Sequence, residues 1–386
     1  MSSSTQWISS SLKESFGVEP TILHSGKIEE ASHGFMSTIQ RIQLEWPNGS
    51  INRPKSVVVK IPGLETMEKA MEDTMDSMDE SIRDKMKEYG NDHMVKISQM
   101  MHNTEADIYG LFRNVVAPFK MPLSYGTSRI GESYPCIIME DIIGTTVTDL
   151  IDGFNQTQLY CIVDEIVDLH VYSYTNNDWK GIKFDKDFDM MEGCSYMLGS
   201  FISNITHKYP KSKSDFDILH KHLISNTEWY STYEKSFYTN ELAVLVHGDM
   251  WSPQFLWKGN ELISIVDWQL SHPGSLTEDL QHLLALCVTS EERKRLTQQL
   301  LKYYYDQLEK KMKLLNRSIP FTFEYLEKDY ISTLPLTTFM SLFALSLWSN
   351  SPVLRSGSDQ DEERIHKMEL RVLSIVRDCI EANEWS

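Results

Sequence analysis

The alternation of polar and apolar residues predicts β-strands in the first third of the chain. Residues Arg41–Trp46 alternate between the two classes, as in a strand with one buried face. A turn at Pro47–Ser50 precedes Ser56–Ile61, which has the composition of a second strand. Ser133–Asp141 (SYPCIIMED) is typical of a buried strand, and Gly144 interrupts the pattern after it. We therefore expect an antiparallel sheet in the N-terminal part.

Apolar residues that recur every three or four positions predict helices in most of the remaining chain. Between Gly63 and Tyr89 such residues form either the buried face of an amphipathic helix or an adaptable methionine surface over an apolar ligand. They are Met67, Met71, Met75, Met78, Ile82 and Met86. A second helix around Thr104–Phe112 carries Glu105. Further along, the predicted helices are Leu159–Ser173, Tyr196–Thr206, Ser214–Ser231, Ser290–Lys313 and Glu362–Asn383.

Two short apolar segments interrupt this helical part. Ala243–Val246 and Leu262–Val266 have the composition of strands, with a turn at Lys258–Asn260 between them. We expect the two strands to pair with each other because they are close in sequence. The pattern as a whole predicts an α+β protein with two lobes. The N-lobe, residues 1–141, contains the sheet, and the C-lobe, residues 142–386, is mostly helical.

Composition and charge narrow the range of partners. The 386 residues carry a net charge of −18, so the surface should repel nucleic acid and anionic membranes. Five cysteines without a CxxC pair argue against a disulfide framework or a structural zinc site and fit a reducing compartment. The apolar run Leu334–Trp348 predicts a buried helix that is too short to span a bilayer, and the N-terminus lacks the pattern of a signal peptide. We expect a soluble, cytoplasmic protein.

Four charged residues stand where strands or helices could bring them together. Lys60 lies in the valine-rich strand, and Glu105 on a helix could orient its ammonium group by an ion pair. Asp249 and Asp267 follow the two C-lobe strands, so both carboxylates should reach the same edge. Two adjacent carboxylates repel each other unless a cation lies between them or one has another role. Phosphoryl transfer from a nucleotide requires such a set of groups: a lysine, acidic metal ligands and a carboxylate base.

Each residue taken alone also has an ordinary structural interpretation, as a charged strand edge for Lys60 and a surface position for Glu105. The order of the motifs is more specific. "HGDMWSPQ" followed by "ISIVDWQ" resembles the catalytic and metal loops of the aminoglycoside phosphotransferase–choline kinase superfamily, and most of all its ecdysteroid-kinase-like (CHK kinase-like) branch. "GFMSTIQRI", "VVVKIP", "TEADIY", "CIIMED" and "SLTEDLQHLL" extend the resemblance over residues 34–284. It implies a bilobal, protein-kinase-like fold.

For the nucleotide, the resemblance implies five positions. Lys60 would contact the phosphates of ATP, and Glu105 would pair with Lys60. Gly34 would lie near the tip of the nucleotide loop, which is poorer in glycine than a GxGxxG sequence. Glu140 and Asp141 would belong to the hinge, whose backbone groups hold adenine.

For the reaction, the resemblance implies five more positions. Asp249 would be the catalytic base, and Asp267 the principal ligand of Mg²⁺. His247 would brace the loop, and Asp279 would accept hydrogen bonds from the catalytic-loop backbone. Gln254 departs from the family pattern, which usually has asparagine there, and a glutamine would be a weaker ligand for the second metal position.

These expectations describe an enzyme that moves the γ-phosphoryl group of ATP to a hydroxyl of a small molecule. The resemblance favours an apolar acceptor, such as a steroid-like alcohol or a hydroxylated xenobiotic. Trp251, Trp268 and Trp348 either line the acceptor pocket or belong to the core. A non-catalytic, pseudokinase-type module that binds nucleotide or ligand is the main alternative, favoured by Gln254 and the glycine-poor loop. A hydrolase that uses Asp249 and His247 is a weaker one, because no serine or cysteine elbow is evident. The oligomeric state is left open.

Overall fold

The computed structural model describes residues 3–28, 37–47, 52–63, 80–182, 190–225, 228–237 and 240–386. For 80–94 and parts of 190–200 it describes the backbone alone. Three predicted features lie outside the described residues: Gly34, most of the turn at Pro47–Ser50, and the methionines between residues 67 and 78.

The N-lobe is built around a five-stranded antiparallel sheet in the order β1-β2-β3-β5-β4. Helix α1 packs on it, and Ile8 and Leu12 of this helix share an apolar cluster with Val57 and Val59 of β3. The sequence patterns predicted β2, β3 and β5 but neither α1 nor β1. The bounds are α1 Ser3–Phe16, β1 Thr21–Lys27, β2 Ser37–Glu45, β3 Ser56–Pro62, β4 Ser124–Ser128 and β5 Cys136–Glu140.

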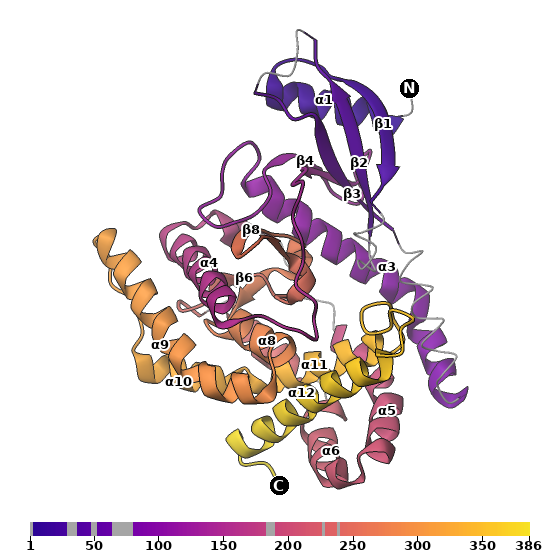
Figure 1. Ribbon diagram of the computed structural model, residues 1–386, viewed down its shortest axis with the longest axis vertical. Coiled ribbons are helices and arrows are strands. Elements are labelled where there is room, and N and C mark those ends of the chain that lie inside the picture. Colours follow the sequence, from indigo (N-terminus) through magenta and orange to yellow (C-terminus); the bar gives the residue numbers. More distant parts are fainter. Residues whose placement is uncertain are drawn as a thin grey trace.

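Helix α3, Glu80–Leu111, has its C-terminal half beside the sheet and its opposite end near the helices of the C-lobe (Figure 1). The sequence predicted two helices here, one ending near Tyr89 and one around Thr104–Phe112. The structure has one continuous helix between these positions, so the expected break is wrong. Residues 90–103 continue the helix because they contain no proline, so each backbone N–H can donate to the carbonyl group four residues earlier.

The C-lobe is mostly helical, and its apolar residues form one large core. One prediction needs correction, because Ser214–Ser231 is not a single helix. Helix α6 passes into a π-helical turn, His220–Ile224, and α7 begins separately. The bounds are α4 Gln156–Thr175, α5 Met190–Lys208, α6 Lys213–Leu219, α7 Glu228–Phe237, α8 Glu278–Cys287, α9 Ser290–Leu314, α10 Phe323–Ser332, α11 Leu334–Trp348 and α12 Asp361–Ala382.

Two small antiparallel sheets carry the loops between α7 and α8. Strand β6, Val244–Val246, pairs with β9, His272–Gly274. Strand β7, Phe255–Lys258, pairs with β8, Glu261–Ile265. The expectation that the two strands before Asp249 and Asp267 pair with each other is therefore wrong. Each has a partner that the sequence patterns did not reveal.

The observed architecture is the expected α+β fold, with a sheet-based N-lobe and a helical C-lobe; the boundary at 141/142 stays a prediction. Trp251, Trp268 and Trp348 are buried in the core, and the rings of Trp251 and Trp348 stack at 4.4 Å. All five cysteines lie in the described part, and none forms a disulfide. Among the described helices, none alone has the length and hydropathy to cross a membrane, although the bent pair α10 and α11 meets both criteria together.

Candidate active site

Lys60 of β3 lies between two carboxylates that come from distant parts of the chain. Its Nζ is 2.6 Å from Glu105 Oε2 on α3 and 2.5 Å from Asp267 Oδ1, which follows β8. The lysine is buried, and so is Glu105. Burial alone would lower the pKa of Lys60, but Asp267 and Glu105 outweigh it and raise the pKa well above its ordinary value. Lys60 is therefore a fixed cation at the interface of the two lobes.

The loop after β6 is held in place from behind by Asp279 of α8. Its carboxylate accepts hydrogen bonds from the backbone N–H groups of His247, at 2.8 Å, and Gly248, at 2.9 Å. Gly248 has a φ of 80°, and a Cβ there would collide with the carbonyl oxygen of Leu270. Only glycine fits this position without strain.

His247 joins the two loops of the site. Its Nε2 is 3.0 Å from the carbonyl oxygen of Val266, and its Nδ1 accepts the N–H of Asp249 at 3.3 Å. These contacts match a neutral ring that carries its proton on Nε2. Burial supports this state, because it lowers the pKa of His247 to about 4. The side chain thus fixes Asp249 relative to the residue before Asp267.

The carboxylates of Asp249 and Asp267 both accept hydrogen bonds from the side-chain amide of Gln254. Nε2 of Gln254 donates to Asp249 Oδ2 at 3.3 Å and to Asp267 Oδ2 at 3.2 Å. Burial and the nearby charge of Asp267 raise the pKa of Asp249 to about 7. A carboxyl with this pKa can accept a proton near neutrality.

The side chains of Asp249, Asp267 and Gln254 contain oxygen atoms of the kind that bind Mg²⁺. Among the described residues no group of three or more His, Cys, Asp or Glu side chains is arranged to hold a metal. Here two carboxylates and one amide meet instead, and carboxylate and amide oxygens are ligands that Mg²⁺ accepts. Gln254 presents its nitrogen to the carboxylates, so the amide must turn over to offer its oxygen. Lys60 supplies a positive charge to Asp267 in the absence of a metal.

In the predicted hinge, the side chain of Asp141 and the backbone N–H of Glu140 already form hydrogen bonds within the protein. The side chain of Asp141 accepts two hydrogen bonds from Arg41, at 2.7 and 3.0 Å, and one from Ser56 at 2.6 Å. The N–H of Glu140 donates to the carbonyl oxygen of Leu123 at 2.8 Å. An adenine ring at this edge would therefore depend on other backbone groups nearby.

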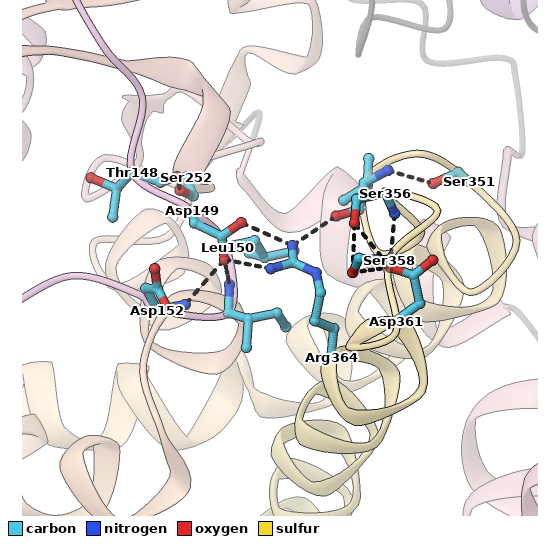
Figure 2. A network of polar contacts seen from close by, with 12 residues as sticks. Thr148, Asp149, Leu150, Asp152, Ser252, Ser351, Ser356, Ser358, Asp361 and Arg364 are labelled. Atoms are coloured by element: carbon cyan, nitrogen blue, oxygen red, sulfur yellow. Dashed lines mark hydrogen bonds and ion pairs between the residues drawn. The ribbon is translucent and has the colours of Figure 1, made fainter.

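A polar network supports the loop after β6 from the side of α12 (Figure 2). Arg364 of α12 binds both carboxylate oxygens of Asp149, at 3.1 and 2.9 Å. Asp149 also accepts the N–H of Ile151 at 2.8 Å, and the preceding residue, Thr148, accepts the hydroxyl of Ser252. The segment after the hinge is thus tied both to the C-terminal helix and to the catalytic loop.

A pocket that is partly open to solvent borders the loop at Gly248. Its apolar lining comes from α3, α11 and the segment after Asp267, namely Met100, Leu270, Leu336 and Met340. Its polar lining includes Glu234, His272, Glu278 and His282. The sequence analysis did not identify His282. The available signal was its spacing of three from Asp279, which places both side chains on one face of a helix.

The fold has counterparts among solved structures. A protein from Ralstonia eutropha assigned as an aminoglycoside phosphotransferase superposes with a TM-score of 0.50 at 12% identity, covering 99% of both chains. The chain therefore has the fold of aminoglycoside phosphotransferases. It belongs to the DUF1679 family, described as "Uncharacterized oxidoreductase dhs-27", whose model matches residues 5–386.

Two proteins from Caenorhabditis elegans are similar to this chain over different shares of its length. The uncharacterized oxidoreductase dhs-27 is 25% identical over 292 residues, which are 72% of this chain. The chain spans only 34% of the length of dhs-27. The uncharacterized kinase-like protein D1044.1 is 24% identical over 377 residues, covering 90% of this chain and 91% of that protein.

Proposed function

We propose that the protein is an ATP-dependent phosphotransferase that acts on a hydroxyl group of a small molecule. The observation that carries this proposal is the meeting of Lys60, Glu105, Asp249, Asp267 and Gln254 at one interlobe site. A fixed cation, two carboxylates and a base with a pKa of about 7 are the groups that phosphoryl transfer needs. The fold, which aminoglycoside phosphotransferases share, agrees with this chemistry.

Each residue has a separate role in the proposed reaction. Lys60, oriented by Glu105, binds the phosphates of ATP and stabilises the charge that develops on the transferred group. Asp249 accepts the proton of the acceptor hydroxyl. Asp267 and Gln254 would hold Mg²⁺, which, when bound, neutralises phosphate charge and aligns the reacting groups. His247 and Asp279 position the loop that carries Asp249.

The pocket supports an acceptor with an apolar body. Met100, Leu270, Leu336 and Met340 line it, and Gly248, the residue before Asp249, borders it. A hydroxyl at one end of such a molecule would face Asp249 while the rest is buried among these side chains. Steroid-like alcohols and hydroxylated xenobiotics have this form.

A direct assay tests the proposal. Purified protein is incubated with ATP, Mg²⁺ and a panel of sterol, terpenoid and phenolic alcohols together with choline, and the mass gain of one phosphoryl group is sought. Asp249→Asn is the matched variant, with turnover expected to fall about 10²–10⁴-fold and nucleotide affinity nearly unchanged. Absence of product across the panel, with no binding of millimolar ATP, would overturn the proposal.

The second candidate function is a non-catalytic module that binds nucleotide or ligand. It is favoured by the way in which Gln254 donates to both carboxylates, since the amide presents its nitrogen, which is not a metal ligand, to the site. Binding of ATP without phosphorylation of any alcohol, and without hydrolysis, would select this alternative.

A further inference from the structure

His282 of α8 lies beside Asp249 but makes no direct hydrogen bond with it. Its Nε2 is 3.8 Å from Asp249 Oδ1, beyond the range of an N–H···O bond. The side chain is largely buried, and this burial lowers its pKa to about 4, so the ring is neutral. One ring nitrogen of a neutral imidazole donates and the other accepts.

The distance between the two side chains suits one bridging atom. An oxygen placed between Nε2 and Oδ1 can lie about 2.8 Å from both, which is the length of an ordinary hydrogen bond. The carboxylate of Asp249 favours the ring form with its proton on Nε2, which faces it. Such an oxygen would accept from His282 and donate to Asp249.

The pocket indicates where this oxygen comes from. His282 lines the pocket together with Gly248 and Asp279, and the apolar side chains of Leu336 and Met340 line the same pocket. His247 offers a contrast within the same site, since both of its ring nitrogens are occupied by backbone groups. His282 instead presents its ring to the pocket.

We propose that His282 binds the acceptor hydroxyl and, together with Asp249, fixes the position of the attacking oxygen. This inference rests on the proposed function and adds a residue to it. Nε2–H of His282 donates to the hydroxyl oxygen without losing its proton. The hydroxyl proton passes to Asp249 as the oxygen bonds to the γ-phosphorus of ATP, and the bond from that phosphorus to the bridging oxygen breaks to release ADP.

Two variants separate this role from a structural one. His282→Leu puts an apolar side chain of moderate size in place of the imidazole ring and removes its N–H donor. The kcat for an alcohol acceptor should therefore fall about 10–100-fold. His282→Gln retains an N–H group at similar reach and should recover most of this loss. The KM for ATP should stay within about twofold in both, because His282 does not contact nucleotide. Equal loss in both variants, or full activity of His282→Leu, would overturn the inference.

A crystal structure of the parent protein with a non-hydrolysable ATP analogue and Mg²⁺ tests the bridge without any acceptor. We expect a water oxygen within about 3 Å of both His282 Nε2 and Asp249 Oδ1. A ring turned away from Asp249, or one bonded to another protein group, would contradict the inference. If the parent phosphorylates no alcohol, the proposed function fails, but this crystal structure still decides whether His282 forms the bridge.

Discussion

At the scale of single residues, the amide of Gln254 is the centre of the site. It donates to Asp249 and Asp267 at 3.3 and 3.2 Å and so holds two carboxylates that would otherwise repel each other. Glutamine is one methylene longer than the asparagine that the resemblance leads one to expect. This extra length must be absorbed within a buried side chain, directly after Pro253, whose φ is fixed.

We expect the identity of residue 254 to set the metal requirement. Gln254→Asn should lower the Mg²⁺ concentration for half-maximal rate or leave it unchanged, because the shorter amide suits the strict geometry of Mg²⁺. Gln254→Ala should raise that concentration several-fold, and the larger Mn²⁺ should support activity of the parent. Titration of both metals against initial rate measures these effects. A Gln254→Ala variant with unchanged metal dependence would show that Gln254 is not a ligand.

The pKa of Asp249 leads to a prediction about pH and rate. Burial and Asp267 raise this pKa to about 7, and a general base is active only when deprotonated. The rate should therefore rise with pH, about tenfold per unit below the pKa, and level off above about 7. A bound cation would move the inflection to lower pH, not higher. Initial rates between pH 5 and 9 at saturating ATP and Mg²⁺ test this, and a flat profile would place the base elsewhere.

At the scale of elements, α12 binds two segments that lie 85 to 221 residues earlier in the sequence, namely the end of α8 and residues 150–151. Arg371 is buried and donates to the carbonyl oxygens of Leu150 and Leu286, both at 2.7 Å, and of Ile151 at 2.5 Å. Burial lowers the pKa of this guanidinium below its ordinary value. The helix thereby fixes the end of α8 and the segment that follows the hinge.

Replacing Arg371 by methionine should destabilise the protein strongly. The change leaves three buried carbonyl groups without their donors, at a cost of roughly 3 kcal/mol in the free energy of unfolding. Arg377 on the same helix is the matched control. Its side chain is 54% exposed and lies 3.3 Å from Asp215, so Arg377→Met should cost less than about 1 kcal/mol. Urea denaturation of the two variants compares them, and equal losses would contradict the role assigned to Arg371.

Much of the fold could be predicted because most elements are long and periodic. Helices α4, α9, α11 and α12 and strands β2, β3 and β5 lie close to their expected positions. The predicted pairing of β6 with β8 was wrong because their actual partners, β9 and β7, are short. Strand β9 has three residues with a central proline, and β7 has four directly after the catalytic loop. Such segments become strands through tertiary contacts, which local propensity does not reveal.

The candidate site was predicted unevenly for a similar reason. Lys60, Glu105, Asp249 and Asp267 stood at the ends or on the faces of predicted elements, and the structure brings them together. The direct contact of Lys60 with Asp267 could not be inferred, because it depends on how the two lobes meet. His282 was missed because a histidine in an apolar helix is usually a core residue, and only the orientation of α8 turns it toward Asp249.

At the scale of the whole molecule, the site and its pocket gather titratable groups in a buried region. Burial raises the pKa of Asp249 and Asp279 to about 7, so both carboxyls are harder to ionise in the folded protein than in the unfolded one. His272 behaves differently. Burial alone would lower its pKa, but Glu278, with Oε1 3.0 Å from Nε2, raises it to about 9. This ion pair joins β9 to α8 at the edge of the pocket.

The His272–Glu278 pair should make stability depend on pH in the alkaline range. Because the folded pKa of His272 lies above its ordinary value of 6.5, its stabilising contribution is complete below about pH 6.5 and is lost as pH rises through about 9. A shift of this size corresponds to at most about 3 kcal/mol, and less in practice because the side chain is partly exposed. His272→Gln cannot carry the charge and removes this contribution. The difference in unfolding free energy between parent and variant, measured in urea at several pH values, should therefore be largest near pH 6 and shrink by roughly 2 kcal/mol by pH 10. A difference that stays constant over this range would show that folding does not raise the pKa of His272.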